Sequence, residues 1–96
     1  MTGYVLQTTL YTDFGIAEMF GQKAVRDTYK RVMEAMKSDY VYLTELVMVL
    51  NWKIWEHYEK NEPLARLYDS LWREADAYAC DNLKGAELEY FYRTTD

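Results

Sequence analysis

The sequence predicts an all-α protein, a small orthogonal helical domain that spans residues 1–96 as a single unit. Apolar side chains recur every three or four residues over three long segments, which is the period of an amphipathic helix. Helix-capping residues separate the segments, and a chain of this length buries enough surface for one modest core. The three main helices are expected at about residues 23–37, 40–60 and 63–83.

The amino-terminal segment is expected to be extended, with a short helix after it. Its side chains alternate with a period of two, and β-formers are common among them. A short helix is then expected near residues 13–21, because Thr12 and Asp13 suit a helix start and Gly21 suits a stop. Four apolar residues of this helix can share one side: Phe14, Ile16, Ala17 and Phe20.

The remaining helix boundaries follow from capping residues. One apolar face runs along the first main helix and consists of Val25, Tyr29, Val32, Met33 and Met36. Ser38 or Asp39 can cap the second main helix, and Pro63 suits the first turn of the third. Gly85 follows the third helix, where a left-handed cap is favoured. The tail fits both a helix and a strand, and we favour a short helix near 86–92.

The stretch "LVMVLNWKIWEHY", residues 46–58, is rich in large apolar side chains. A membrane-spanning helix needs about 20 apolar residues. Polar and charged side chains interrupt this run within that length, so no membrane span is expected. On a helical wheel, a wide apolar arc that includes Leu46, Leu50 and Trp55 lies opposite a charged arc. The stretch is therefore predicted to be the central helix, packed by neighbours on two or three sides.

Val49 and Trp52 break this pattern, because both fall inside the charged arc. Two explanations stay open: either the amino-terminal segment or the tail covers them, or another protein does. We take the second as the working hypothesis, since misplaced apolar anchors are typical of interfaces. A homo-oligomer or a complex with another protein is expected, and the candidate interface residues are Val49, Trp52, Glu45 and Glu56.

Residues 14–37 offer an alternative, because "IAEMFGQKAVRDTYKRV" looks like a helix-turn-helix. Four basic residues lie close together on its second helix: Lys23, Arg26, Lys30 and Lys37. However, Asp27 and Glu34 lie beside them and offset their charge, and the apolar residues after the turn do not fall at the usual positions. Nucleic-acid binding is therefore the second hypothesis.

No catalytic, cofactor or metal site is predicted, so we expect neither an enzyme nor a small-molecule substrate. His57 has acidic neighbours, but neither Glu56 nor Glu59 has the i+3 or i+4 spacing that places two ligands on one helix face. Cys80 has no second cysteine with it and is expected to fill space. The sequence contains no glycine-rich phosphate loop and no nucleophile elbow.

Composition and charge narrow the classes of partner. The net charge is −5, and residues 41–96 hold the excess of acidic groups, which repels nucleic acid at long range. Ten tyrosines, three tryptophans and three phenylalanines favour a protein interface. The single cysteine excludes an internal disulfide, and the first residues do not resemble a signal peptide. A cytoplasmic protein is expected.

The chain contains three distinctive stretches: "TTLYTDFGIAEMFG", "DYVYLTELVMVLNWKIWEHYE" and "DAYACDNLKGAELEYFYRTTD". They resemble small uncharacterised proteins of integrative and conjugative elements and prophage-like regions in gut Gram-positive bacteria. The resemblance implies a cytosolic accessory role in a mobile genetic element, and it assigns no activity and no functional residue. The expected function is therefore a non-enzymatic, self-associating protein-interaction module, and the alternative is a small nucleic-acid-binding regulator that uses residues 14–37.

Overall fold

The computed structural model describes residues 3–95, with side chains from Leu6 onward, and contains five α-helices there. They are α1 (Gly3–Glu18), α2 (Gln22–Met36), α3 (Tyr40–His57), α4 (Glu62–Asn82) and α5 (Gly85–Thr95). The predicted all-α class is confirmed. The division into three main helices is not found, because α1 has 16 residues and is slightly longer than α2, which has 15.

The amino-terminal helix α1 replaces both the predicted extended segment and the predicted short helix. Its buried side chains follow one another at spacings of four, four and three residues: Leu6, Leu10, Phe14 and Ala17. This is a helical stripe, and burying it outweighs the β-propensity of the intervening threonines and tyrosines. Ile16 and Phe20, which were expected to share the buried side, are exposed. Residues 1 and 2 lie outside the described part of the chain.

The predicted caps explain where the other helices begin and end. Asp39 precedes α3, and its carboxylate accepts hydrogen bonds from the backbone N–H groups of Val41 at 3.0 Å and Tyr42 at 3.2 Å. Pro63 lies in the first turn of α4 as predicted. Gly21 and Gly85 adopt φ angles of 106° and 57°, which favour glycine, after α1 and after α4. The tail forms the helix α5, so the helical alternative is confirmed.

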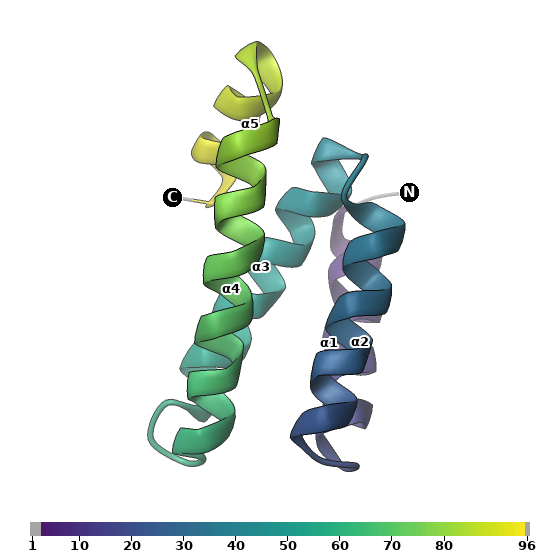
Figure 1. Ribbon diagram of the computed structural model, residues 1–96, viewed down its shortest axis with the longest axis vertical. Helices are drawn as coiled ribbons and strands as arrows, with labels where there is room; N and C mark the ends of the chain where they lie inside the picture. Colours follow the sequence, from purple (N-terminus) through teal and green to yellow (C-terminus); the bar gives the residue numbers. More distant parts are fainter. Residues whose placement is uncertain (1–2, 96) are drawn as a thin grey trace.

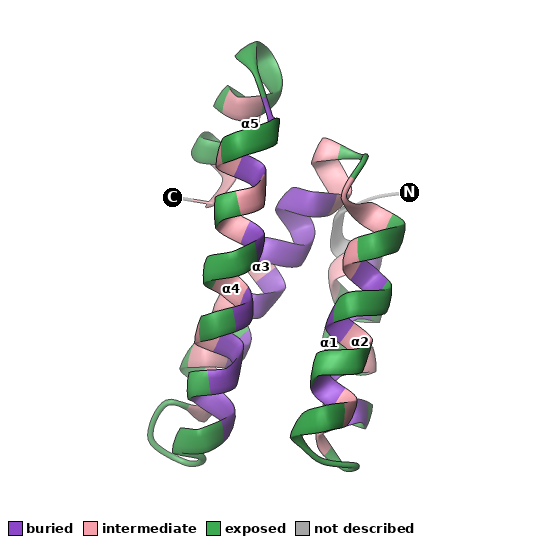
Figure 2. Cartoon of the chain, viewed as in Figure 1, coloured by how far each residue is buried: buried purple, intermediate pink, exposed green. Residues whose placement is uncertain are grey.

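Helix α3 is the centre of the packing. Figure 1 shows α1 and α2 side by side, α4 on the other side of the molecule, and α3 running obliquely behind them. It contacts each of the other four helices, and its contact with α4 is the most extensive. Figure 2 accordingly shows much of α3 as buried. Its fully buried apolar residues are Leu43, Leu46, Val47, Val49 and Leu50. None of the helices in residues 3–95 is long and apolar enough to cross a membrane.

Candidate functional site

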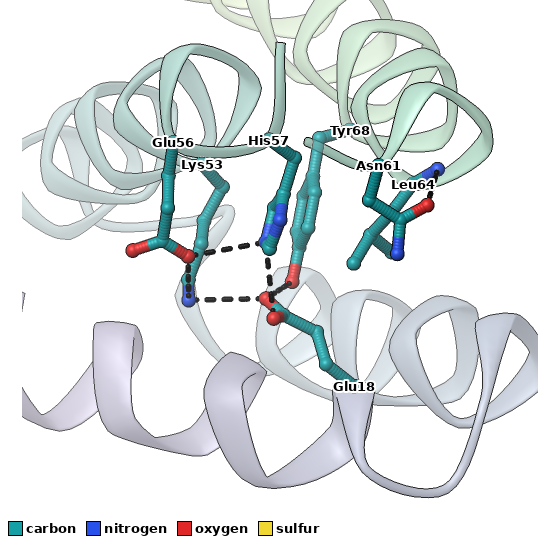
Figure 3. A network of polar contacts seen from close by, with 7 residues as sticks. All are labelled: Glu18, Lys53, Glu56, His57, Asn61, Leu64 and Tyr68. Carbon is teal, nitrogen blue, oxygen red and sulfur yellow. Dashed lines mark hydrogen bonds and ion pairs between the residues drawn. The ribbon is translucent and has the colours of Figure 1, made fainter. Parts of the chain in front are cut away.

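Polar and charged side chains from three helices meet where the carboxyl ends of α1 and α3 approach the start of α4 (Figure 3). We call this group the Lys53 cluster, and it consists of Glu18 of α1, Lys53, Glu56 and His57 of α3, and Tyr68 of α4. From the sequence, Glu56 was considered beside His57, but neither was connected with Lys53, Glu18 or Tyr68. Their separation along the chain leaves no local signal for such a meeting.

Lys53 is the central cation of the cluster. Its side chain is only 2% exposed, and its Nζ lies 3.0 Å from Glu18 Oε2 and 3.1 Å from Glu56 Oε2. The same atom lies 3.9 Å from the centroid of the Tyr11 ring, a cation–π contact. Because an unpaired buried ammonium is very costly, both carboxylates and the ring are needed to hold it there. Its burial also keeps Nζ away from a dissolved substrate.

His57 contributes a buried ring nitrogen to the cluster. Its Nε2 lies 3.0 Å from Glu18 Oε1 and 3.1 Å from Glu56 Oε2, although the ring N–H is aimed well at neither oxygen. One ligand atom from each of these three residues lies within 4.8 Å of the others, which is close enough for a metal ion. A metal would have to share both carboxylates with the Lys53 ammonium, which pairs with each of them and offsets one of their two negative charges. We therefore interpret the group as an ion-pair network that joins helices.

Hydrogen bonds set the ionisation state of Glu18, the carboxylate that α1 contributes to the cluster. Burial by itself would raise the pKa of Glu18, but hydrogen bonds from Tyr68 and Lys53, with the positive charge of Lys53, outweigh it and lower that pKa below its ordinary value. The Tyr68 hydroxyl donates to Glu18 Oε2 at 2.5 Å. Burial and this hydrogen bond raise the pKa of Tyr68. The network thus contains an ionised carboxylate held by a neutral phenol and a buried cation.

Helix α1 explains why two candidate interface residues are buried. Glu45, Val49 and Lys53 follow one another every four residues along one side of α3. Glu45 accepts a hydrogen bond from Gln7, and Lys53 contacts Glu18, so α1 covers this side. Val49 is 0% exposed and Glu45 is also buried. Both are therefore core residues and not interface residues. This agrees with the explanation that the amino-terminal segment covers them.

Trp52 and Glu56 have different positions. Glu56 is half-buried in the Lys53 cluster, where it pairs with Lys53. Trp52 is 41% exposed, one turn away from Trp55, which is 65% exposed. The prediction that Trp55 belongs to the apolar arc packed in the core is wrong. A short row of exposed tryptophans along α3 therefore replaces the predicted pair of Val49 and Trp52.

Two hollows flank Trp52, and we call them together with it the Trp52 face. The hollow beside α1 has a volume of about 430 Å³ and is lined by Gln7, Thr8, Tyr11 and Trp52. The hollow beside α5 has a volume of about 280 Å³ and is lined by Val47, Met48, Asn51, Trp52, Trp72, Thr94 and Thr95. Trp52 is the one residue that lines both hollows, and it is 41% exposed. None of these lining residues carries a charge.

Three of the four basic residues of the alternative hypothesis lie on α2, and Lys37 is the residue that follows it. Lys23 pairs with Asp27 at 2.8 Å and Lys37 pairs with Glu34 at 3.1 Å, while Arg26 and Lys30 are exposed. Helices α1 and α2 lie alongside each other in opposite directions (Figure 1). The helices of a helix-turn-helix instead cross at about 90–120°. The basic residues therefore lie along one side of the chain's second helix and its end. However, α1 and α2 do not cross at the angle with which a helix-turn-helix places its second helix in a DNA groove.

Comparison of the chain with protein-family models, with curated proteins and with solved structures gives no match. The candidate site therefore rests on the geometry described above.

Proposed function

We propose that this protein is a non-enzymatic protein-interaction module that self-associates through the Trp52 face. The observation that carries the proposal is the position of Trp52, a partly exposed indole that lines two uncharged hollows. An aromatic anchor surrounded by neutral side chains is typical of the centre of an interface. Trp52 itself belongs to α3, which contacts each of the other four helices, so the indole is presented on a rigid element.

The energetics favour covering this face. Burying a large aromatic side chain is worth roughly 2–3 kcal/mol, and Trp52 retains a substantial exposed fraction after folding. The neighbouring Trp55, stacked obliquely against Tyr58 with ring centroids 5.4 Å apart, extends the apolar surface along α3. Because the Lys53 cluster and the core already fix the fold, this surface is available to a partner without any rearrangement of the helices.

The wider role that we propose is that of a cytoplasmic accessory protein of a mobile genetic element. The support for it is the resemblance of three stretches of the chain to proteins of such elements. The resemblance assigns no activity, so we propose only an interaction that serves the element. Nucleic-acid binding by α2 is not proposed beside it, because two of its four basic residues are paired with acidic neighbours.

Sedimentation velocity over a wide range of concentration tests the proposal. The wild type is expected to shift from monomer to a larger species, and Trp52→Glu is expected to stay monomeric with its melting temperature nearly unchanged. Phe20→Glu is the matched control, because Phe20 is an exposed aromatic residue at the turn after α1, and that variant should associate as the wild type does. A wild type that stays monomeric, or a Trp52→Glu protein that unfolds, would contradict the proposed function.

A further inference from the structure

We propose that two copies of the chain meet about a two-fold axis, so that Trp52 of each copy enters the hollow beside α5 of the other. The inference rests on the proposed function and adds the partner, the symmetry and the residues that face each other. In a two-fold interface the same patch serves both copies, so each patch must carry a projection and a matching depression. The Trp52 face can supply both, because the indole is 41% exposed and lies beside the hollow that the second copy would use.

The chemistry of the hollow fits an indole. Met48 and Trp72 provide apolar and aromatic surface, against which a ring can pack at an edge or with an offset. Asn51, Thr94 and Thr95 provide side-chain oxygens at the same hollow. A buried indole N–H needs an acceptor, and these oxygens can supply one. The hollow therefore offers what a tryptophan requires at both its apolar and its polar edge.

Charge favours a second copy over an acidic or basic partner. The chain has a net charge of −5, so two copies repel each other wherever their acidic surfaces face. The ten residues that line the two hollows contain no charged side chain, although 28% of the chain is charged. Two like-charged copies approach at lowest cost through such a neutral face. A basic partner would instead be expected to seek the acidic surface.

A mixing experiment tests the two-fold arrangement. Trp52→Lys removes the projection, and Thr94→Glu places a charge in the hollow; both residues are partly exposed, so both variants should fold. Each variant alone is expected to associate at least about tenfold more weakly than the wild type, since an aromatic anchor at an interface is worth a factor of that size or more. In an equimolar mixture, one contact pairs Lys at position 52 with Glu at position 94. The other contact places Trp52 of one copy in a hollow that keeps Thr94 and differs from the wild-type hollow only at its own position 52. The mixture is therefore expected to form heterodimers more tightly than either variant forms homodimers.

The outcomes separate this inference from the proposed function. Recovery of association in the mixture, measured by sedimentation of the two variants alone and together, supports the two-fold arrangement. If the wild type associates and the mixture shows no recovery, the arrangement is wrong and self-association through another contact stands. If the wild type does not associate at all, both proposals fail. Thr95→Glu, at the neighbouring position of the same hollow, repeats the test should Thr94→Glu fold poorly.

Discussion

At the scale of the residue, Lys53 is the side chain on which the junction of α1 and α3 depends. Its ammonium is buried between Glu18 and Glu56, so replacing it with methionine leaves two carboxylates without their cation. Lys53→Met is expected to lower the free energy of unfolding by about 3–5 kcal/mol, the usual cost of breaking a buried ion pair from one side. Denaturant unfolding measures this, and Lys23→Met is the control, because Lys23 forms an exposed pair with Asp27 and should change stability little. Equal effects of the two substitutions would contradict the role of Lys53.

The lowered pKa of Glu18 predicts a dependence of stability on pH. Because the folded-state pKa lies below the ordinary value of 4.5, ionised Glu18 stabilises the fold at and above that pH. The contribution is lost as the pH falls from about 4.5 through the folded-state pKa. Glu18→Gln should therefore reduce the fall in unfolding free energy over this acidic range, measured as denaturant unfolding at a series of pH values. Identical pH profiles for the two proteins would count against an ionised Glu18 in the network.

At the scale of the element, α1 shows what local patterns can and cannot predict. Asp39, Pro63 and Gly85 act through neighbouring backbone groups, so α3, α4 and the turn before α5 were predictable from the sequence. Residues 4–11 alternate as a strand does and also carry a helical stripe, of which Leu6 and Leu10 are part. Packing against α2 and α3 decides between the two periods, and a single-sequence pattern contains no information about that packing.

Helix α1 also contains a glycine in its interior. A Cβ added at Gly15 would come no closer than 3.8 Å to another group, the Lys53 Nζ, which is an ordinary contact. Gly15→Ala is therefore expected to stabilise the protein by about 0.5–1 kcal/mol, because alanine loses less backbone freedom in a helix. The contrasting variant is Gly85→Ala, which should destabilise by about 1–2 kcal/mol at its φ of 57°. Thermal or denaturant unfolding distinguishes them, and a destabilising Gly15→Ala would mean that the contact with Lys53 is tighter than described.

At the scale of the whole molecule, the candidate site was predictable only in part. Trp52 was recognised because it lies among charged residues, and it is exposed. Val49 gave the same signal, and Glu45 is one of the charged residues around it. Both are buried, since a charged arc on a helix can be covered when a neighbour supplies partners such as Gln7. Thr94 and Trp72 were not associated with Trp52, because the hollow that they line is formed by three helices far apart in the sequence.

Salt should strengthen the association between copies. Each chain carries a net charge of −5, and the residues that line the hollows are uncharged. Added salt screens the repulsion between the chains without weakening any ion pair at the contact. The apparent dissociation constant from sedimentation equilibrium is therefore expected to fall as sodium chloride increases. Association that weakens steeply with salt would indicate contacts between opposite charges, as in the binding of a nucleic-acid backbone.

Copies of the chain are proposed to meet at Trp52, and a dilution series followed by NMR tests this contact most directly. The chain has three tryptophans, so its three indole N–H signals report three positions separately. The signal of Trp52 is expected to shift most between concentrated and dilute protein, and that of Trp72, which lines the same hollow, should shift with it. Indole signals that do not change on dilution, or a shift confined to Trp55, would contradict the account.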